Sequence, residues 1–172
     1  MSLSLPRRLL TLLLLAIIGL TPACGGSDAK ADDGKIDVLP KSVLGDDVLG
    51  LSVSQEKLTD TVVGTKRTYL DAIGLYSLRK GDLLQATLQV SRFKTDAKYA
   101  KSKFRQSILQ QIGTTVPRPF RMAGRTVYLT TGKRQNVAVW FTGRYAYVLS
   151  TRQEYEAPRA LLRRALEIKL DD

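Results

Sequence analysis

The stretch LLQATLQVSRF, residues 83–93, decides the fold class. Polar residues stand between its regularly spaced apolar residues, which are Leu84, Ala86, Leu88 and Val90. When apolar residues recur at every second position of a strand, successive side chains point to opposite faces of the sheet. The stretch therefore predicts a strand with one buried face and one solvated face, as is common in antiparallel sheets.

Further strands are predicted on both sides of this stretch. A turn at Lys80-Gly81-Asp82 connects it to an earlier strand. After it come three segments rich in Val, Tyr, Trp, Phe and Thr, separated by short glycine-containing turns, which is typical of an antiparallel meander. The other expected strands are residues 66–70, 75–78, 125–130, 136–141 and 145–150.

Two helices complete the predicted domain. Apolar residues recur at helical spacing from Ala97 to Ile112, after a capping residue at Asp96. Pro158 opens the second helix. Its expected apolar face consists of Leu161, Leu162, Ala165, Leu166 and Ile168. The sequence therefore predicts a two-layer α+β domain, an antiparallel sheet of about five strands with two helices on one face.

Residues 1–23 have the pattern of a signal peptide. The basic pair Arg7-Arg8 precedes an apolar run over residues 9–20. This run is too short for a transmembrane helix, which takes about 20 apolar residues. We therefore expect the mature protein to be exported.

The end of the signal carries the sole cysteine of the chain. Leu20-Thr21-Pro22-Ala23-Cys24 resembles the lipobox of bacterial lipoproteins. The resemblance implies cleavage before Cys24 and attachment of a lipid to its sulfur, which would hold the protein at the cell membrane on the extracytoplasmic side. The alternative is an ordinary secretory signal that leaves a free amino-terminal thiol.

The mature chain is predicted to have two parts. Residues 24–41 consist mainly of Gly, Ser, Asp, Lys and Ala, which bury too little surface to fold, and we expect a flexible acidic linker. Residues 42–172 have the length of a single basic domain. The expected order of strands and helices resembles that of small envelope lipoproteins of the Mog1/PsbP-like kind, which implies an envelope location but no particular activity.

The composition disfavours an enzyme, a metal site and a cofactor. The chain has no histidine, which removes the commonest general base and the commonest zinc ligand. With one cysteine it has no intramolecular disulfide. A Ser-Lys pair at Lys101-Ser102 has poor geometry, because adjacent helical residues point in different directions. Isolated glycines form no phosphate-binding loop.

Basic residues predict an anion-binding surface. The chain has 27 basic and 16 acidic residues, and Asp96 is the one acid between residues 94 and 144. The candidate anion-binding residues are Lys94, Lys98, Lys101, Arg105, Arg118, Arg121 and Arg125. Because an exported protein meets anionic lipids and wall polymers rather than nucleic acid, these are the expected partners. A solvated helix face is the alternative interpretation.

Aromatic residues of the meander predict a second kind of site. The candidates are Tyr128, Trp140, Tyr145 and Tyr147, which could line an apolar surface for a lipid or peptide. Ordinary core packing is the alternative. We therefore expect a non-enzymatic, lipid-anchored envelope protein that binds an anionic membrane surface, wall polymer or acidic protein. The second hypothesis is a carrier or sensor that holds an apolar ligand against the aromatic sheet face.

Overall fold

The computed structural model of the protein describes residues 36–58, 70–94, 105–106, 109–110, 112 and 115–170. The predicted signal, Cys24 and residues 24–35 of the predicted linker lie outside these residues. Lys98 and Lys101 also lie outside them. The predictions of export, lipid attachment and a cationic helix stripe therefore stay predictions.

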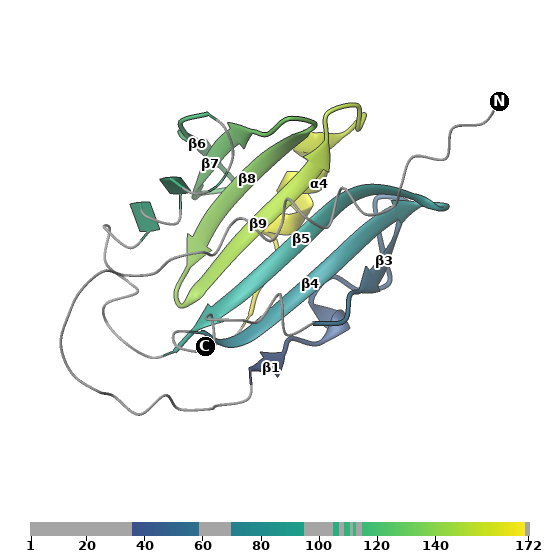
Figure 1. The fold of residues 1–172 in the computed structure, drawn as a ribbon, viewed down its shortest axis with the longest axis horizontal. Helices are drawn as coiled ribbons and strands as arrows, with labels where there is room; N and C mark the ends of the chain where they lie inside the picture. Colours follow the sequence, from purple (N-terminus) through teal and green to yellow (C-terminus); the bar gives the residue numbers. More distant parts are fainter. Residues whose placement is uncertain are drawn as a thin grey trace.

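The described residues form one large sheet (Figure 1). Its strands are β1 (Asp37–Val38), β2 (Asp47–Val48), β3 (Leu51–Gln55), β4 (Leu70–Lys80), β5 (Leu83–Phe93), β6 (Arg118–Met122), β7 (Arg125–Thr131), β8 (Gln135–Thr142) and β9 (Tyr145–Arg152). Their order is β2-β3-β4-β5-β9-β8-β7-β6, and β1 lies beside β4. The β1–β4 pair is parallel and the other pairs are antiparallel. A short 3-10 helix, η2, covers Lys41–Val43.

The predicted fold class is wrong. The sheet has nine strands rather than about five, and the described residues contain one α-helix longer than a turn, α4 (Pro158–Leu166). The protein is therefore predominantly β. Short strands account for most of the difference, because two to five residues carry too little periodicity to be recognised.

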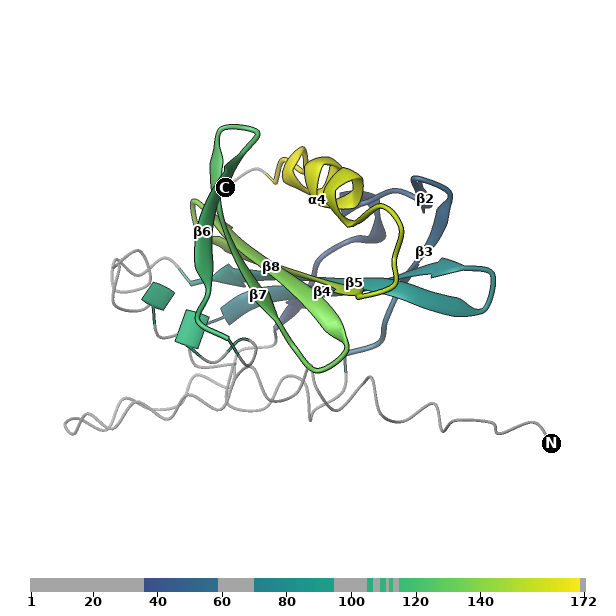
Figure 2. The ribbon, with the colours of Figure 1, turned by 90° about the horizontal axis from the view of Figure 1, so that it is seen from above.

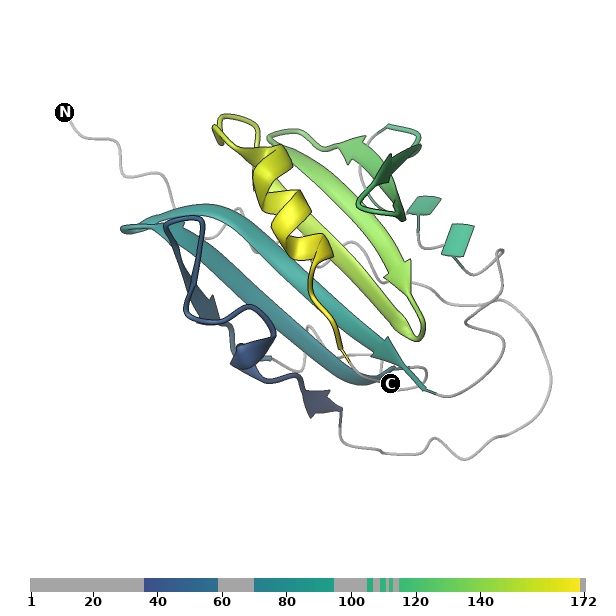
Figure 3. The same cartoon turned by 180° about the vertical axis from the view of Figure 1, so that it is seen from behind.

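Helix α4 lies across one face of the sheet and covers the main core (Figure 3). Pro158 stands at the first helical position, where its missing N–H costs no hydrogen bond. As predicted, Leu161, Leu162, Ala165 and Leu166 are buried against the sheet. The face of the sheet that α4 covers is called the helix face below.

The opposite face, called the back face below, is buried too. Leu109 and Ile112, which we expected on a helix beside α4, instead form a cluster with Val137, Val139 and Val148. These valines alternate along β8 and β9 with residues of the helix-face core. Leu109 and Ile112 therefore pack on the face of the sheet opposite to α4.

Burial of both faces also changes the interpretation of β5. Its apolar residues face α4 as expected, but Thr87, Gln89 and Ser91 on the predicted solvated face are buried. The Gln89 side-chain amide donates a hydrogen bond to Ser91 Oγ at 3.1 Å, which satisfies part of this polarity. The strand was predicted correctly and its solvent exposure was not.

The first described residues already belong to the packed structure. Asp37 and Val38 pair with β4, and Ile36 and Leu39 are buried. The fold thus extends into residues 36–41, which composition had assigned to the linker. The cause is the burial of Ile36 and Leu39, whose large apolar side chains pack into core clusters on either side of β1 in the chain.

The β6–β7 hairpin curls away from the plane of the sheet, toward the side on which α4 lies (Figure 2). Two residues, Ala123 and Gly124, connect its strands with φ of 49° and 74°. Two positive φ values in a two-residue loop are the geometry of a type I′ turn, which follows the natural twist of a hairpin. The hairpin forms a wall beside the helix face.

The left-handed backbone conformation at residue 123 strains alanine, and asparagine tolerates it better. Ala123→Asn is therefore expected to stabilise the protein by about 0.5 to 1 kcal/mol. Urea denaturation measures the change. Ala160→Asn is the matched control, because Ala160 is exposed within α4, where asparagine is a poorer helix former. A loss of stability in Ala123→Asn equal to that of the control would contradict the assignment of the turn.

Candidate functional site

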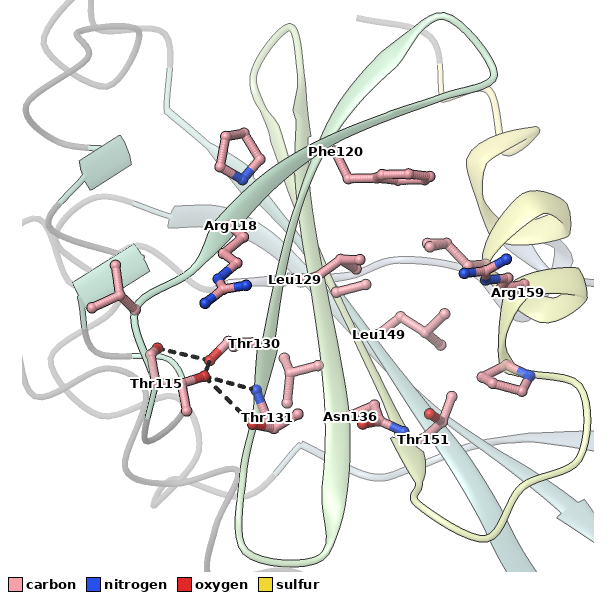
Figure 4. Close-up of a pocket in the computed structure, with 16 residues that line it drawn as sticks. Thr115, Arg118, Phe120, Leu129, Thr130, Thr131, Asn136, Leu149, Thr151 and Arg159 are labelled. Atoms are coloured by element: carbon pink, nitrogen blue, oxygen red, sulfur yellow. Dashed lines mark hydrogen bonds between the residues drawn. The ribbon is translucent and has the colours of Figure 1, made fainter.

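A cavity of about 1070 Å³ opens between α4 and the β6–β7 hairpin. Figure 4 shows the side chains that surround it. They are Thr115, Val116, Arg118, Pro119, Phe120, Leu129, Thr130, Thr131, Asn136, Val137, Ala138, Leu149, Thr151, Pro158, Arg159 and Leu162. The described lining is mostly apolar and contains two arginines and no acidic residue.

Strand register places these residues together. Arg118 of β6 pairs with Leu129 of β7, Leu129 with Ala138 of β8, and Ala138 with Leu149 of β9. Residues that pair across a sheet share a face, so this row runs along the helix face from the hairpin toward α4. The row Leu129–Ala138–Leu149 forms the floor of the cavity and is called the apolar floor below.

A neighbouring row provides a polar end. Thr131 pairs with Asn136, and Asn136 pairs with Thr151, two residues along each strand from the apolar floor. The cavity thus changes from an aliphatic middle to an amide and two hydroxyl groups at one end (Figure 4). Such a combination of apolar lining and few polar groups is typical of small-molecule sites.

Two large apolar side chains that the hairpin strands contribute to this cavity are unusually exposed. Phe120 of β6 retains 43% of its accessible surface and Leu129 retains 38%. In Figure 4 both lie between the hairpin wall and α4. Their exposed surface faces a concave space rather than a flat surface, and a bound apolar group would remove it from water.

Arg118 and Arg159 stand on opposite walls of the cavity (Figure 4). Arg118 comes from β6 and Arg159 from the first turn of α4. Neither forms an ion pair with another residue in the part of the chain that the structure describes. The cavity therefore has two positive charges and, among its described lining residues, no negative charge.

Threonine hydrogen bonds fix the segment that leads into the hairpin wall. Thr130 Oγ1 lies 2.8 Å from Thr115 Oγ1, and the Thr130 hydroxyl also donates to the Thr115 carbonyl at 2.8 Å. The Thr131 N–H donates to Thr115 Oγ1 at 3.2 Å. These contacts tie the chain before β6 to β7 and so position Val116 and Arg118 at the cavity.

The described members of the predicted anion-binding set do not form one surface. Arg118 and Arg125 lie on the helix-face side of the hairpin, and Arg121 alternates to the other side. Arg105 lies 5.4 Å from the Phe141 ring centroid, in a cation–π contact on the back face. Lys94 follows β5 and is partly buried. Of this set, Arg118 alone lines the cavity.

The predicted aromatic ligand surface is not formed. Trp140, Tyr145 and Tyr147 are buried in the helix-face core, where Trp140 stacks on Tyr147 with ring centroids 5.0 Å apart. Tyr128 lies on the back face in edge-to-face contact with Phe141. None of the four lines the cavity, because the aromatic pairs fill the core one row away from the apolar floor.

Charged side chains outside the cavity pair with one another, as at Asp71. The Asp71 carboxylate accepts a hydrogen bond from Arg92 Nε at 2.5 Å and one from Arg144 Nη1 at 3.4 Å. The hydrogen bond that Arg92 donates to the Asp71 carboxylate raises the pKa of Arg92. Among the described residues, no three His, Cys, Asp or Glu side chains are grouped as metal ligands. No helix in the described part is both long and apolar enough to cross a membrane.

Sequence reasoning missed most of the cavity because it missed β6. Residues 116–120 contain two prolines, and no strand was predicted there. An edge strand tolerates proline, since one side of it needs no hydrogen bonds. The alternation of Arg118 and Phe120, followed by Ala123-Gly124 before the next strand, is the signal that could have revealed the hairpin.

The cavity between α4 and the β6–β7 hairpin is thus identified as the candidate site from its geometry. Comparisons of the chain with protein-family models, with curated proteins and with solved structures found no match.

Proposed function

We propose that this protein is a non-enzymatic binding protein that holds a ligand with an apolar body in the cavity beside α4. The observation that carries the proposal is the exposure of Phe120 and Leu129 inside a concave space of about 1070 Å³. Pockets for small organic ligands usually measure about 300 to 1,000 Å³ and are mainly apolar. The cavity is large enough for such a ligand.

The proposal replaces the aromatic sheet face with the apolar floor as the place where the ligand lies. It keeps the expectation of a carrier or sensor in the cell envelope, lipid-anchored through Cys24 and facing the extracytoplasmic side. An exported protein tethered in this way would meet lipids and other amphipathic molecules. A cavity with an aliphatic floor suits a ligand of that kind.

Leu129→Trp is expected to weaken ligand binding at least ten-fold, because the larger side chain fills the space above the apolar floor. Leu129 is partly exposed, so the change should leave the core and the stability nearly unaltered. The measurement is titration with phenylnaphthylamine, an uncharged probe whose fluorescence rises in apolar surroundings. Direct excitation of the probe avoids interference from the added tryptophan.

Leu83→Trp serves as the matched control for this titration. Leu83 is also an exposed leucine of a strand, but it lies at the start of β5 and does not line the cavity. Tight probe binding by the unaltered protein and by Leu83→Trp, with weak binding by Leu129→Trp, supports the proposal. Equal binding by all three, or no binding at all, contradicts it.

Binding to an anionic surface is the second candidate function. It is favoured by the absence of acidic residues from position 97 to position 153, a stretch that includes Arg121 and Arg125 of the hairpin. Such binding would use the tip of the hairpin, where Arg121 and Arg125 flank the turn, rather than the cavity, and it would weaken with salt. Sedimentation with anionic vesicles at low and high salt distinguishes it, since cavity binding of an uncharged probe is insensitive to salt.

A further inference from the structure

We infer that the cavity selects an amphipathic acid, a ligand with an aliphatic chain and a carboxylate head group that Arg118 and Arg159 recognise. The inference rests on the proposed function, because it names the class of ligand for the same cavity. An apolar floor alone would accept uncharged ligands equally well. The two arginines are the feature that an uncharged ligand would leave unused.

The electrostatics of the lining support a negative head group. Both arginines line the cavity, and among the described residues no acid lines it and none forms an ion pair with either arginine. Two like charges beside one cavity repel each other and make the electrostatic potential there positive. An anion between or beside them relieves that repulsion and forms charge-assisted hydrogen bonds with a guanidinium group.

The position of Arg159 at the amino end of α4 adds to the positive potential of the cavity. It lies in the first turn of α4, and the N-cap residue Ala157 provides no side-chain hydrogen bond. Unpaired N–H groups give the amino end of a helix a partial positive charge, which favours an anion nearby. The helix end supplements the arginine here and does not define the site by itself.

The apolar floor is the surface on which we expect the aliphatic chain of the ligand to lie. Leu129 and Leu149 lie between the two arginine-bearing walls in Figure 4. An aliphatic chain laid along this row would bury carbon against carbon, while its carboxylate reaches one wall. Short aliphatic side chains present no ring for stacking, so a flexible chain fits the floor better than an aromatic ligand does.

Competition between a matched acid and alcohol tests the inference. Decanoic acid and decanol, which share an alkyl chain length, are titrated separately against bound phenylnaphthylamine near neutral pH. In the unaltered protein the acid is expected to displace the probe at a concentration roughly ten-fold lower than the alcohol, because a charge-assisted hydrogen bond adds to the binding. Arg118→Gln and Arg159→Gln should each reduce this preference, and the double variant should abolish it.

Arg121→Gln and Arg163→Gln are the matched controls. They remove the same charge from β6 and from α4, but neither residue lines the cavity. Preference for the acid should persist in both. If the preference falls equally in controls and cavity variants, the effect is one of net charge and the inference is wrong.

The two proposals fail in different ways. If the probe binds and the acid and alcohol displace it equally, the head-group inference is overturned and the proposed function stands. If the probe does not bind, or binds Leu129→Trp as well as it binds the unaltered protein, the proposed function itself is overturned. Circular dichroism of each variant verifies that a loss of binding does not come from unfolding.

Discussion

Gly74→Ala is expected to destabilise the protein by about 2 to 4 kcal/mol, although it adds a single methyl group. Gly74 lies within β4, and the Tyr76 ring lies back along the strand over it. A Cβ at residue 74 would lie 2.5 Å from Tyr76 Oη and 2.8 Å from two ring carbons. These distances are shorter than van der Waals contact, so the ring or the strand must move.

The ring has little freedom to move. Tyr76 is fully buried, and its hydroxyl donates hydrogen bonds to the Pro40 carbonyl at 2.9 Å and the Leu39 carbonyl at 3.3 Å. Overpacking a core costs about 1 to 3 kcal/mol, and a lost hydrogen bond costs about 1 kcal/mol more. Equilibrium urea denaturation measures the sum.

Gly132→Ala is the control for the Gly74 variant. A Cβ there would lie 3.2 Å from Gln135 Cγ, which belongs to a flexible side chain that can move aside. Its stability should change by less than about 1 kcal/mol, because alanine also reduces the freedom of the unfolded chain. Adding Tyr76→Leu to Gly74→Ala should cost less than the two separate changes together. Equal stability of the two alanine variants would show that the ring is not confined.

Gly74 also shows where sequence reasoning reached its limit. Glycine is depleted in strands, so the segment around it was predicted to be two strands, residues 66–70 and 75–78. The structure has a single strand, Leu70–Lys80, in which glycine makes room for an aromatic side chain two positions away. Local propensity indicated a break in the strand at Gly74. It did not show that the Tyr76 ring lies over Gly74 in the folded strand and that glycine is needed there.

Elements with strong periodicity were predicted well. The strand predicted over residues 83–93 is β5 with the same bounds, and the helix opened by Pro158 is α4. Long strands with regular alternation and a helix with a clear apolar face carry their own signal. The fold class failed mainly because the short strands carry too little periodicity to be recognised. In addition, strand alternation does not specify which face of the sheet a helical segment covers.

The candidate site was predictable in its chemistry but not in its place. Basic residues and an apolar ligand surface were both expected, and Arg118 was among the candidates. The aromatic residues drew attention because they are large, yet large side chains fill cores more often than they line cavities. Arg159 was not among the candidates, and the curl of the hairpin places the cavity beside it. Curvature of a sheet is not encoded in the alternation of one strand.

The stability of the protein is expected to fall by about 2 to 3 kcal/mol between pH 10 and pH 12 because of Tyr76. Burial disfavours the phenolate and raises the pKa of Tyr76 to about 12 from its ordinary value of 10.0. Below pH 10 the phenol is protonated in both the folded and the unfolded chain, so it contributes no pH dependence. Between the two pKa values the unfolded chain loses the proton and the folded chain keeps it, which favours unfolding as the pH rises.

Tyr76→Phe separates this effect from the titration of other groups. The variant should be less stable near pH 7 by about 1 kcal/mol, because the hydrogen bonds to the Leu39 and Pro40 carbonyls are lost. Its stability should then fall less steeply than that of the unaltered protein above pH 10, so the two curves converge. Urea denaturation at intervals from pH 7 to pH 12 measures both curves, and lysine and arginine titration affects them equally. Parallel curves across that range would mean that the Tyr76 hydroxyl reaches water in the folded protein. Tyr76 would then not be confined, and the Gly74 prediction, which depends on that confinement, would be wrong too.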